Sequence, residues 1–174
     1  MANCSIENKM MATQSKTQKL TKEHFRFLQE KLGFKYDPTF NTYSNEKICI
    51  IISSSRLEPV VEIWVKSEPR FTTMNFKWYI NYLEEKELLQ SKKLGNTLEA
   101  NFKYFSQLLN KHIKTIIRED RKVLIKVIKL FLMTAKRHLR FSTRQLIKAD
   151  EEYKKLYQYV KNNDPNWKPN SDIS

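Results

Sequence analysis

Two acids and a lysine near the middle of the chain have the spacing of a metal-dependent nuclease site. Glu84, Glu85 and Lys86 are consecutive, so one carboxylate lies two residues before a lysine, and Glu62 could supply an upstream acid. Such a set can hold a divalent cation beside a phosphodiester. The match is short, however, and in a chain with 29% charged residues a solvated helix face explains it better. We therefore expect no catalytic residues, and a nuclease around Glu62, Glu84 and Lys86 is the third hypothesis.

Motifs for phosphate-cradling loops and for metal sites are missing from the sequence. The two glycines, Gly33 and Gly95, lie far apart, whereas phosphate-cradling loops need clustered glycines. There is no Cys-x-x-Cys and no His-Glu-x-x-His, and the three histidines are isolated along the chain, at His24, His112 and His138. The sequence therefore predicts no metal site and no cofactor.

The cysteine content favours a reduced, cytoplasmic setting. Cys4 and Cys49 are too few for a disulfide scaffold, and Cys49 lies in an apolar run, which predicts an inert buried thiol. Residues 1–20 lack the apolar run of a secretory signal. No stretch reaches the ~18 apolar residues of a membrane span.

Positive charge is concentrated in the C-terminal half. The net charge is +13 over 174 residues, and residues 111–148 carry 12 basic against 2 acidic side chains. Five of the eight arginines lie between Arg118 and Arg144, and a coding bias toward lysine does not explain that cluster. The candidate binding residues are Lys111, Lys114, Arg118, Lys122, Lys126, Lys129, Lys136, Arg137, Arg140 and Arg144.

Residues 121–144 combine this charge with a helical apolar pattern. Several of the basic residues recur at helical spacing, and the opposite face is apolar, with Leu124, Ile128, Leu132, Ala135 and Leu139. A basic face can attract phosphate backbones, an acidic protein or an anionic membrane surface. It can also be simply the solvent-exposed face of a packed helix, with no binding role.

The elements that must position these residues follow from hydrophobic periodicity. Residues 1–19 read as a disordered lead-in, and a helix from Thr21 to Leu32 should end at Gly33, with Phe34 folding back onto its last turn. Residues 35–46 read as a loop. Strands are predicted at residues 47–53, 60–66 and 71–80, and they form an antiparallel meander.

The C-terminal half is predicted to be helical. Asn96 with Glu99, and Ser142 with Gln145, have the spacing of helix-start capping boxes. We expect a break at residues 118–121, where Asp120 can cap the helix that follows. Helices are predicted at about residues 96–117, 121–140 and 142–161.

Together these elements predict a single α+β domain over residues 20–162. It comprises an N-terminal helix and a three-stranded antiparallel meander in residues 20–93, then a C-terminal bundle of three to four helices in residues 96–162. Residues 163–174 are expected to be a frayed tail.

Phe25-Arg26-Phe27-Leu28 is followed by Leu32-Gly33-Phe34, a polar loop and the predicted meander. Over about residues 21–118, this pattern resembles a loose group of small bacterial α+β proteins that are uncharacterised or of the immunity type encoded beside toxins. The resemblance implies a non-enzymatic binder that covers a partner's surface. The basic extension at residues 119–162 departs from the pattern.

The sequence thus predicts a non-catalytic cytoplasmic interaction protein whose basic C-terminal helices bind an acidic protein partner. The alternative is an accessory protein that contacts the phosphate backbone of RNA or DNA with the same helices.

Overall fold

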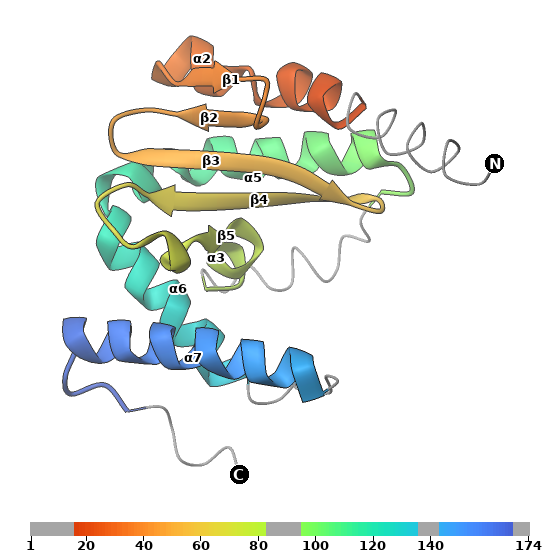
Figure 1. Ribbon diagram of the computed structural model, residues 1–174. Helices are drawn as coiled ribbons and strands as arrows, with labels where there is room; N and C mark the ends of the chain where they lie inside the picture. Colours follow the sequence, from red (N-terminus) through yellow and green to blue (C-terminus); the bar gives the residue numbers. More distant parts are fainter. Residues whose placement is uncertain (1–15, 83–94, 136–142, 169–174) are drawn as a thin grey trace.

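The computed structural model describes residues 16–82, 95–135 and 143–168 of the chain. Within these ranges the fold is α+β, with N-terminal helices, an antiparallel sheet and C-terminal helices (Figure 1). The described sheet has the strand order β1-β2-β3-β4-β5, so each strand pairs with its neighbour in sequence. The predicted fold class is therefore confirmed, but the sheet has five described strands instead of three, and the helices are arranged differently.

The N-terminal helix begins earlier than predicted. Residues 16–25 are helical, Arg26 forms a turn, and α2 (Phe27–Leu32) follows. Residues 16–19 thus belong to a helix, although they were expected in the disordered lead-in. Thr21, where the helix was expected to begin, lies inside it: Thr21 is fully buried, and its Oγ1 accepts a hydrogen bond from Asn41 Nδ2 at 3.0 Å.

Gly33 ends α2 as predicted. Its φ of +69° places it in the left-handed region, where a glycine has no Cβ penalty. The amide of Gly33 donates to the carbonyl of Gln29, and the amide of Phe34 donates to that of Leu28. Phe34 is buried against the helix, so the turn directs the chain into the sheet.

Of the five described strands, two were predicted and two short ones lie in a segment whose composition did not indicate strands. β3 (Ile48–Ser55) and β4 (Glu58–Val65) match the predicted runs at residues 47–53 and 60–66. β1 (Lys35–Asp37) and β2 (Thr42–Ser44) lie in the segment predicted as a loop, so that prediction was wrong there. The aromatic pair Tyr36 and Tyr43, directly opposite each other with ring centroids 4.7 Å apart, stabilises this polar hairpin.

The predicted third strand over residues 71–80 was wrong. It is replaced by the 3₁₀ turn η1 (Arg70–Thr72), the two-residue strand β5 (Met74–Asn75) and the helix α3 (Phe76–Tyr82). Asn75 begins the helix, since its Oδ1 accepts a hydrogen bond from the amide of Lys77 at 2.9 Å. Phe76, Tyr79 and Ile80 are buried at helical spacing.

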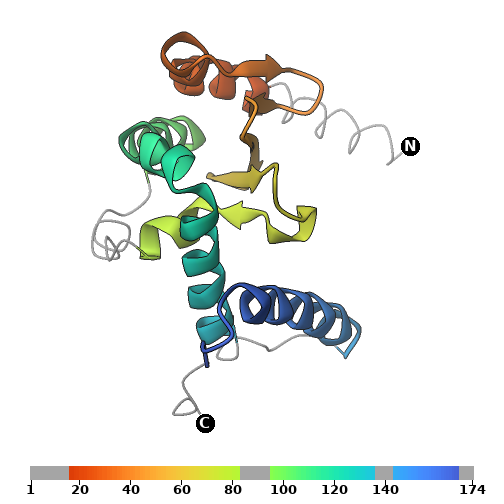
Figure 2. The ribbon, with the colours of Figure 1, turned by 90° about the vertical axis from the view of Figure 1, so that its left-hand side faces the viewer.

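The core lies between one face of the sheet and α5 (Leu98–Arg118). Side chains of β3 and β4 alternate, and every second one is buried, namely Ile48, Ile50, Ile52, Val61, Ile63 and Val65. α5 lies on that face of the sheet (Figures 1 and 2) and buries Phe102, Phe105, Leu109 and Ile113 there.

The C-terminal helices do not form a separate bundle. α5 packs on β4, α6 (Asp120–Ala135) packs on α3 and α7 (Thr143–Asn163) packs on α6 and η1. The predicted break is confirmed: α5 ends at Arg118 and the Oδ1 of Asp120 accepts a hydrogen bond from the amide of Arg121. The cap of α5 is Thr97 instead of Asn96, since the Thr97 hydroxyl accepts from the amide of Ala100 at 3.2 Å. Ser142, the other predicted cap, lies outside the described residues.

The start of the predicted frayed tail packs onto the domain. Asn163 is still helical, and the ring of Trp167 lies 5.8 Å from that of Tyr157. The Nζ of Lys161 donates to the carbonyl of Trp167 at 3.0 Å. Residues 163–168 therefore hold the end of α7 in place.

Candidate anion-binding surface

A hollow of about 590 Å³ lies at the end of the sheet where β1 begins and where β2 and β4 end. Three exposed lysines from three segments line it together with mostly polar neighbours; the lining is Gly33, Lys35, Ser44, Asn45, Glu46, Lys47, Lys66 and Ile117. Converging ammonium groups raise the local concentration of anions. The hollow is therefore suited to an anionic group.

The backbone around Asn45 brings these lysines together. The Oδ1 of Asn45 accepts hydrogen bonds from the amides of Lys47 and Ile48, both at 2.9 Å. The amide of Lys66 donates to the carbonyl of Lys47 at 2.8 Å, and its Nζ donates to the carbonyl of Asn45 at 2.5 Å. The loop before β3 is thus tied to the end of β4, which keeps two of the lysines side by side.

The C-terminal end of α5 adds further charge to this region. Ile117 lines the hollow, and the exposed Lys114 and Arg118 lie three residues before it and one after it. This end of α5 and the start of α6 face the viewer in Figure 2. We call Lys35, Lys47, Lys66, Lys114 and Arg118 the strand-end basic surface.

Two acids lie close to this surface. Glu46 is part of the hollow's lining, and Glu119 forms an ion pair with Arg118 at 3.1 Å. The Arg118 side chain is 73% exposed, and ion pairs that are this exposed contribute little energy. The pair therefore leaves the guanidinium accessible to a competing anion.

Of the described basic side chains predicted as the binding face of α6, some are exposed to solvent and others pack against the protein. Lys122 is exposed, as is Lys111 on α5, whereas Lys126 is half-buried. Lys129 is 21% exposed in its side chain, and its Nζ lies 2.5 Å from the Oδ2 of Asp164. Lys136, Arg137 and Arg140 lie outside the described residues, and for Arg144 only its place in α7 is known.

The opposite, apolar face of α6 follows the prediction. Leu124, Ile128 and Leu132 are buried. The amphipathic pattern of this helix is therefore confirmed over its described side chains, and Lys129 is the member of the candidate set that holds α6 to the segment after α7.

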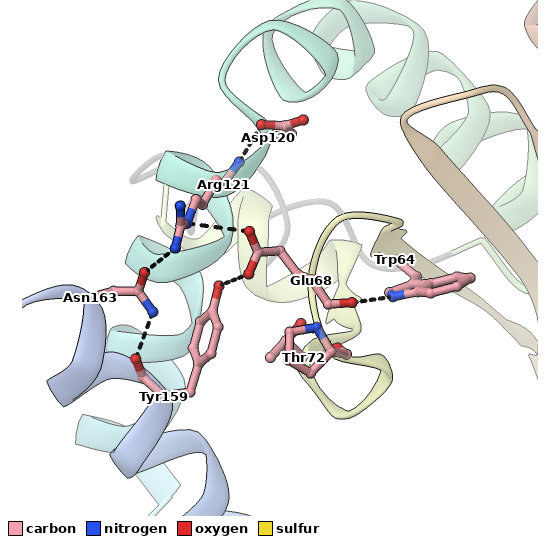
Figure 3. Close-up of polar contacts among 8 residues, drawn as sticks. Trp64, Glu68, Thr72, Asp120, Arg121, Tyr159 and Asn163 are labelled. Carbon is pink, nitrogen blue, oxygen red and sulfur yellow. Dashed lines mark hydrogen bonds and ion pairs between the residues drawn. The ribbon is translucent and has the colours of Figure 1, made fainter.

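Arg121, also on α6, belongs to a polar network that fastens α7 to the rest of the domain (Figure 3). Glu68, only 8% exposed in its side chain, accepts a hydrogen bond from the Tyr159 hydroxyl at 2.8 Å and forms an ion pair with Arg121 at 3.3 Å. Arg121 also donates to Asn163 at 2.6 Å. Burial, and then the bond to Glu68, raise the pKa of Tyr159, so this hydroxyl is a donor at neutral pH.

The segment between β4 and η1, which carries Glu68, is also fastened to the sheet. The indole Nε1 of Trp64 donates to the carbonyl of Glu68 at 3.0 Å, and the guanidinium of Arg70 lies 4.4 Å from the Trp64 ring centroid. The contacts around Glu68 therefore join β4, α6 and α7. Arg121 therefore has a structural role in holding these elements together, and its position needs no binding partner to explain it.

The residues of the nuclease hypothesis are not brought together in the described part of the chain. Glu62 lies half-buried in β4, opposite Ile51 and Asn75. Glu84 and Lys86 lie outside the described residues. Cys49 is a free thiol and half-buried, and burial raises its pKa.

The lysines of the hollow were absent from the predicted set. Lys35, Lys47 and Lys66 are spread over 32 positions of sequence, and only the antiparallel register of the strands makes them neighbours. The sequence carries no local charge run at any of them.

Comparison of the chain with protein-family models, with curated proteins and with solved structures finds no match. Over the described ranges, none of the helices combines the length and the apolar character needed to cross a bilayer.

Proposed function

We propose that this chain is a non-catalytic binding protein that holds the phosphate backbone of RNA or DNA on the strand-end basic surface. The observation that carries the proposal is the convergence of Lys35, Lys47 and Lys66 on one hollow beside the end of α5. Phosphate contacts by lysine and arginine release condensed counterions, and that release drives non-specific binding to nucleic acids.

The surroundings of the hollow favour phosphate over an acidic protein. A protein partner normally buries apolar side chains within its interface. Ile117 is the one apolar side chain of the lining, and it is half-buried against the core. The large exposed hydrophobic residues in the described part of the chain lie elsewhere: Phe40 and Leu57 at the opposite sheet end, and Phe71 beside α7.

The test is fluorescence anisotropy of labelled single-stranded RNA and duplex DNA between 50 and 200 mM salt. If the five side chains of the surface each neutralise one phosphate of the duplex, log Kd should change with log salt with a slope of about 4.5. Lys35→Gln, Lys47→Gln and Lys114→Gln combined should lower that slope by about 2.7. Over this fourfold salt range, the wild type should then lose roughly 40-fold more affinity than the variant.

A charge-matched control separates the surface from net charge. Lys19, Lys155 and Lys168 are exposed and lie on other segments, and their combined change to Gln removes the same charge. Binding and slope should be close to wild type in this control. Equal losses in both triple variants would contradict the assignment of the surface, and no binding to either nucleic acid at 50 mM salt would overturn the proposal in favour of an acidic protein.

A further inference from the structure

Three metal-ligating side chains from distant parts of the sequence meet beside the N-terminal helix. Glu23 and His24 lie in the helix at residues 16–25, and Glu99 lies in the first turn of α5. One carboxylate oxygen of each glutamate and one ring nitrogen of His24 all lie within 4.8 Å of one another. The histidine, isolated in sequence, is therefore not isolated in the fold.

The scaffold around this cluster is well packed. The rings of Phe25 and Phe102, one residue from His24 and three from Glu99, meet edge to face at 6.1 Å and are fully buried. The side-chain Nδ2 of Asn101 donates to the carbonyls of Leu57 and Gly95, at 2.6 and 3.1 Å. The start of α5 is thus held against both the first helix and the β3–β4 turn, which fixes the distance between the two glutamate backbones.

Within the described part of the chain, the two carboxylates and the Nε2 of His24 have no other hydrogen-bond or ion-pair partner. Neither Glu23 nor Glu99 has an ion pair or side-chain hydrogen bond with another described residue. The Nε2 of His24 is buried and has no hydrogen-bond partner within the described ranges. A buried ring nitrogen without a partner costs free energy, and two nearby carboxylates repel each other. A cation bound to this Nε2 and to the two carboxylates would relieve both costs.

We propose that Glu23, His24 and Glu99 form a binding site for a divalent transition-metal ion of the Zn²⁺ type. One imidazole with two carboxylates is a ligand set that suits Zn²⁺ better than Mg²⁺ or Ca²⁺, which prefer oxygen alone. Zn–N and Zn–O bonds of about 2.0–2.2 Å place tetrahedral ligands roughly 3.4 Å apart. Both glutamates are exposed, so their side chains have the rotamer freedom to close the remaining distance.

Such an ion would link the first helix to α5. Three protein ligands leave a fourth position for water, and the ion would add a cross-link between residues 23–24 and 99. Binding to the folded chain alone stabilises it by mass action. The expected consequence is a metal-dependent gain in stability that does not depend on the strand-end basic surface.

The test uses the tag-free full-length chain after chelator treatment and desalting, with ZnCl₂ as the probe. Isothermal titration should show one site, and at zinc concentrations about 100 times Kd the Tm should rise by roughly 5–10 °C. His24→Gln and Glu99→Gln should each lose this rise. MgCl₂ at equal concentration should produce a much smaller one.

Comparing each variant with and without zinc removes the effect of the substitution on the fold. Glu99 also lies at a helix N-terminus, so its change to Gln lowers the stability of the metal-free chain slightly. Glu151→Gln, on an exposed position of α7, is the matched control and should keep the full rise. An unchanged Tm with zinc in the wild type, or a full zinc response in His24→Gln, would overturn the proposal.

Discussion

Removing the carboxylate of Glu68 should loosen α7 from the rest of the domain. This side chain is 8% exposed, and it joins the Tyr159 hydroxyl of α7 to Arg121 of α6. Glu68→Ala leaves the Tyr159 hydroxyl without its acceptor, which costs about 1–3 kcal/mol. The ion pair adds little, about 0–1 kcal/mol, because the Arg121 side chain is 60% exposed. A loss of about 3 kcal/mol corresponds to a drop in Tm of roughly 6–12 °C for a chain of this length.

A double-mutant cycle with Tyr159→Phe identifies the source of that loss. Tyr159→Phe alone should cost about 1.5–3 kcal/mol, the value of a hydrogen bond to a charged group, because it leaves the Glu68 carboxylate without this donor. Once Glu68 is alanine, removing the hydroxyl should cost nothing or be slightly favourable, because no unpaired donor remains. The coupling energy should therefore exceed about 1 kcal/mol.

Urea unfolding followed by far-ultraviolet circular dichroism measures all four variants of the cycle. Glu68→Gln is the control, because it removes the charge but keeps an oxygen that can accept from Tyr159. It should lie between the wild type and Glu68→Ala. Additive losses in the cycle would refute the reasoning, since they would mean that the two side chains do not share an interaction in solution.

Three further outcomes follow from the structure. The Lys129 hydrogen bond lowers the pKa of Asp164 below its unfolded value, so the wild type should be more stable than Asp164→Asn at pH 7. That advantage should shrink in urea titrations as the pH falls from about 5 through the lowered pKa. Burial raises the pKa of the Cys49 thiol, so in Cys4→Ser its alkylation at pH 7 should be slower when folded than in urea. Gly95→Ala places a Cβ 2.7 Å from a side-chain carbon of α5, and calorimetry should show a loss of about 1–3 kcal/mol.

Local signals in the sequence were enough for several elements and helix ends. The left-handed turn at Gly33 and the break before Asp120 follow from residue types that act within one turn of helix. The prediction of a strand over residues 71–80 was wrong because tertiary packing, and not a local signal, determines the structure there. The apolar residues of this segment fit period two through Met74 and Trp78, yet Phe76, Tyr79 and Ile80 also fit a helix, and packing against α6 selected the second pattern.

The candidate sites depend on contacts that sequence spacing does not contain. Lys35 and Lys66 become neighbours through the register of several strands, and Glu99 reaches His24 through the packing of two helices. The β1–β2 hairpin that carries Lys35 is mostly polar, and its aromatic pair has no recognisable period in so short a segment. Tertiary packing overrides local preference most easily in such segments.

The position of α6 explains why a count of its charges is a poor measure of a binding surface. Arg121 donates to Asn163, and Lys129 forms an ion pair with Asp164. The ion pair neutralises the charge of Lys129, and both contacts secure the last helix. Lys122 faces solvent instead. Since long cationic side chains serve packing as readily as recognition, charge concentrated on one helix says less about a partner than charge that converges from separate segments. On that criterion the lysines at the strand ends, although scattered in sequence, are the stronger candidates for contact with an anion.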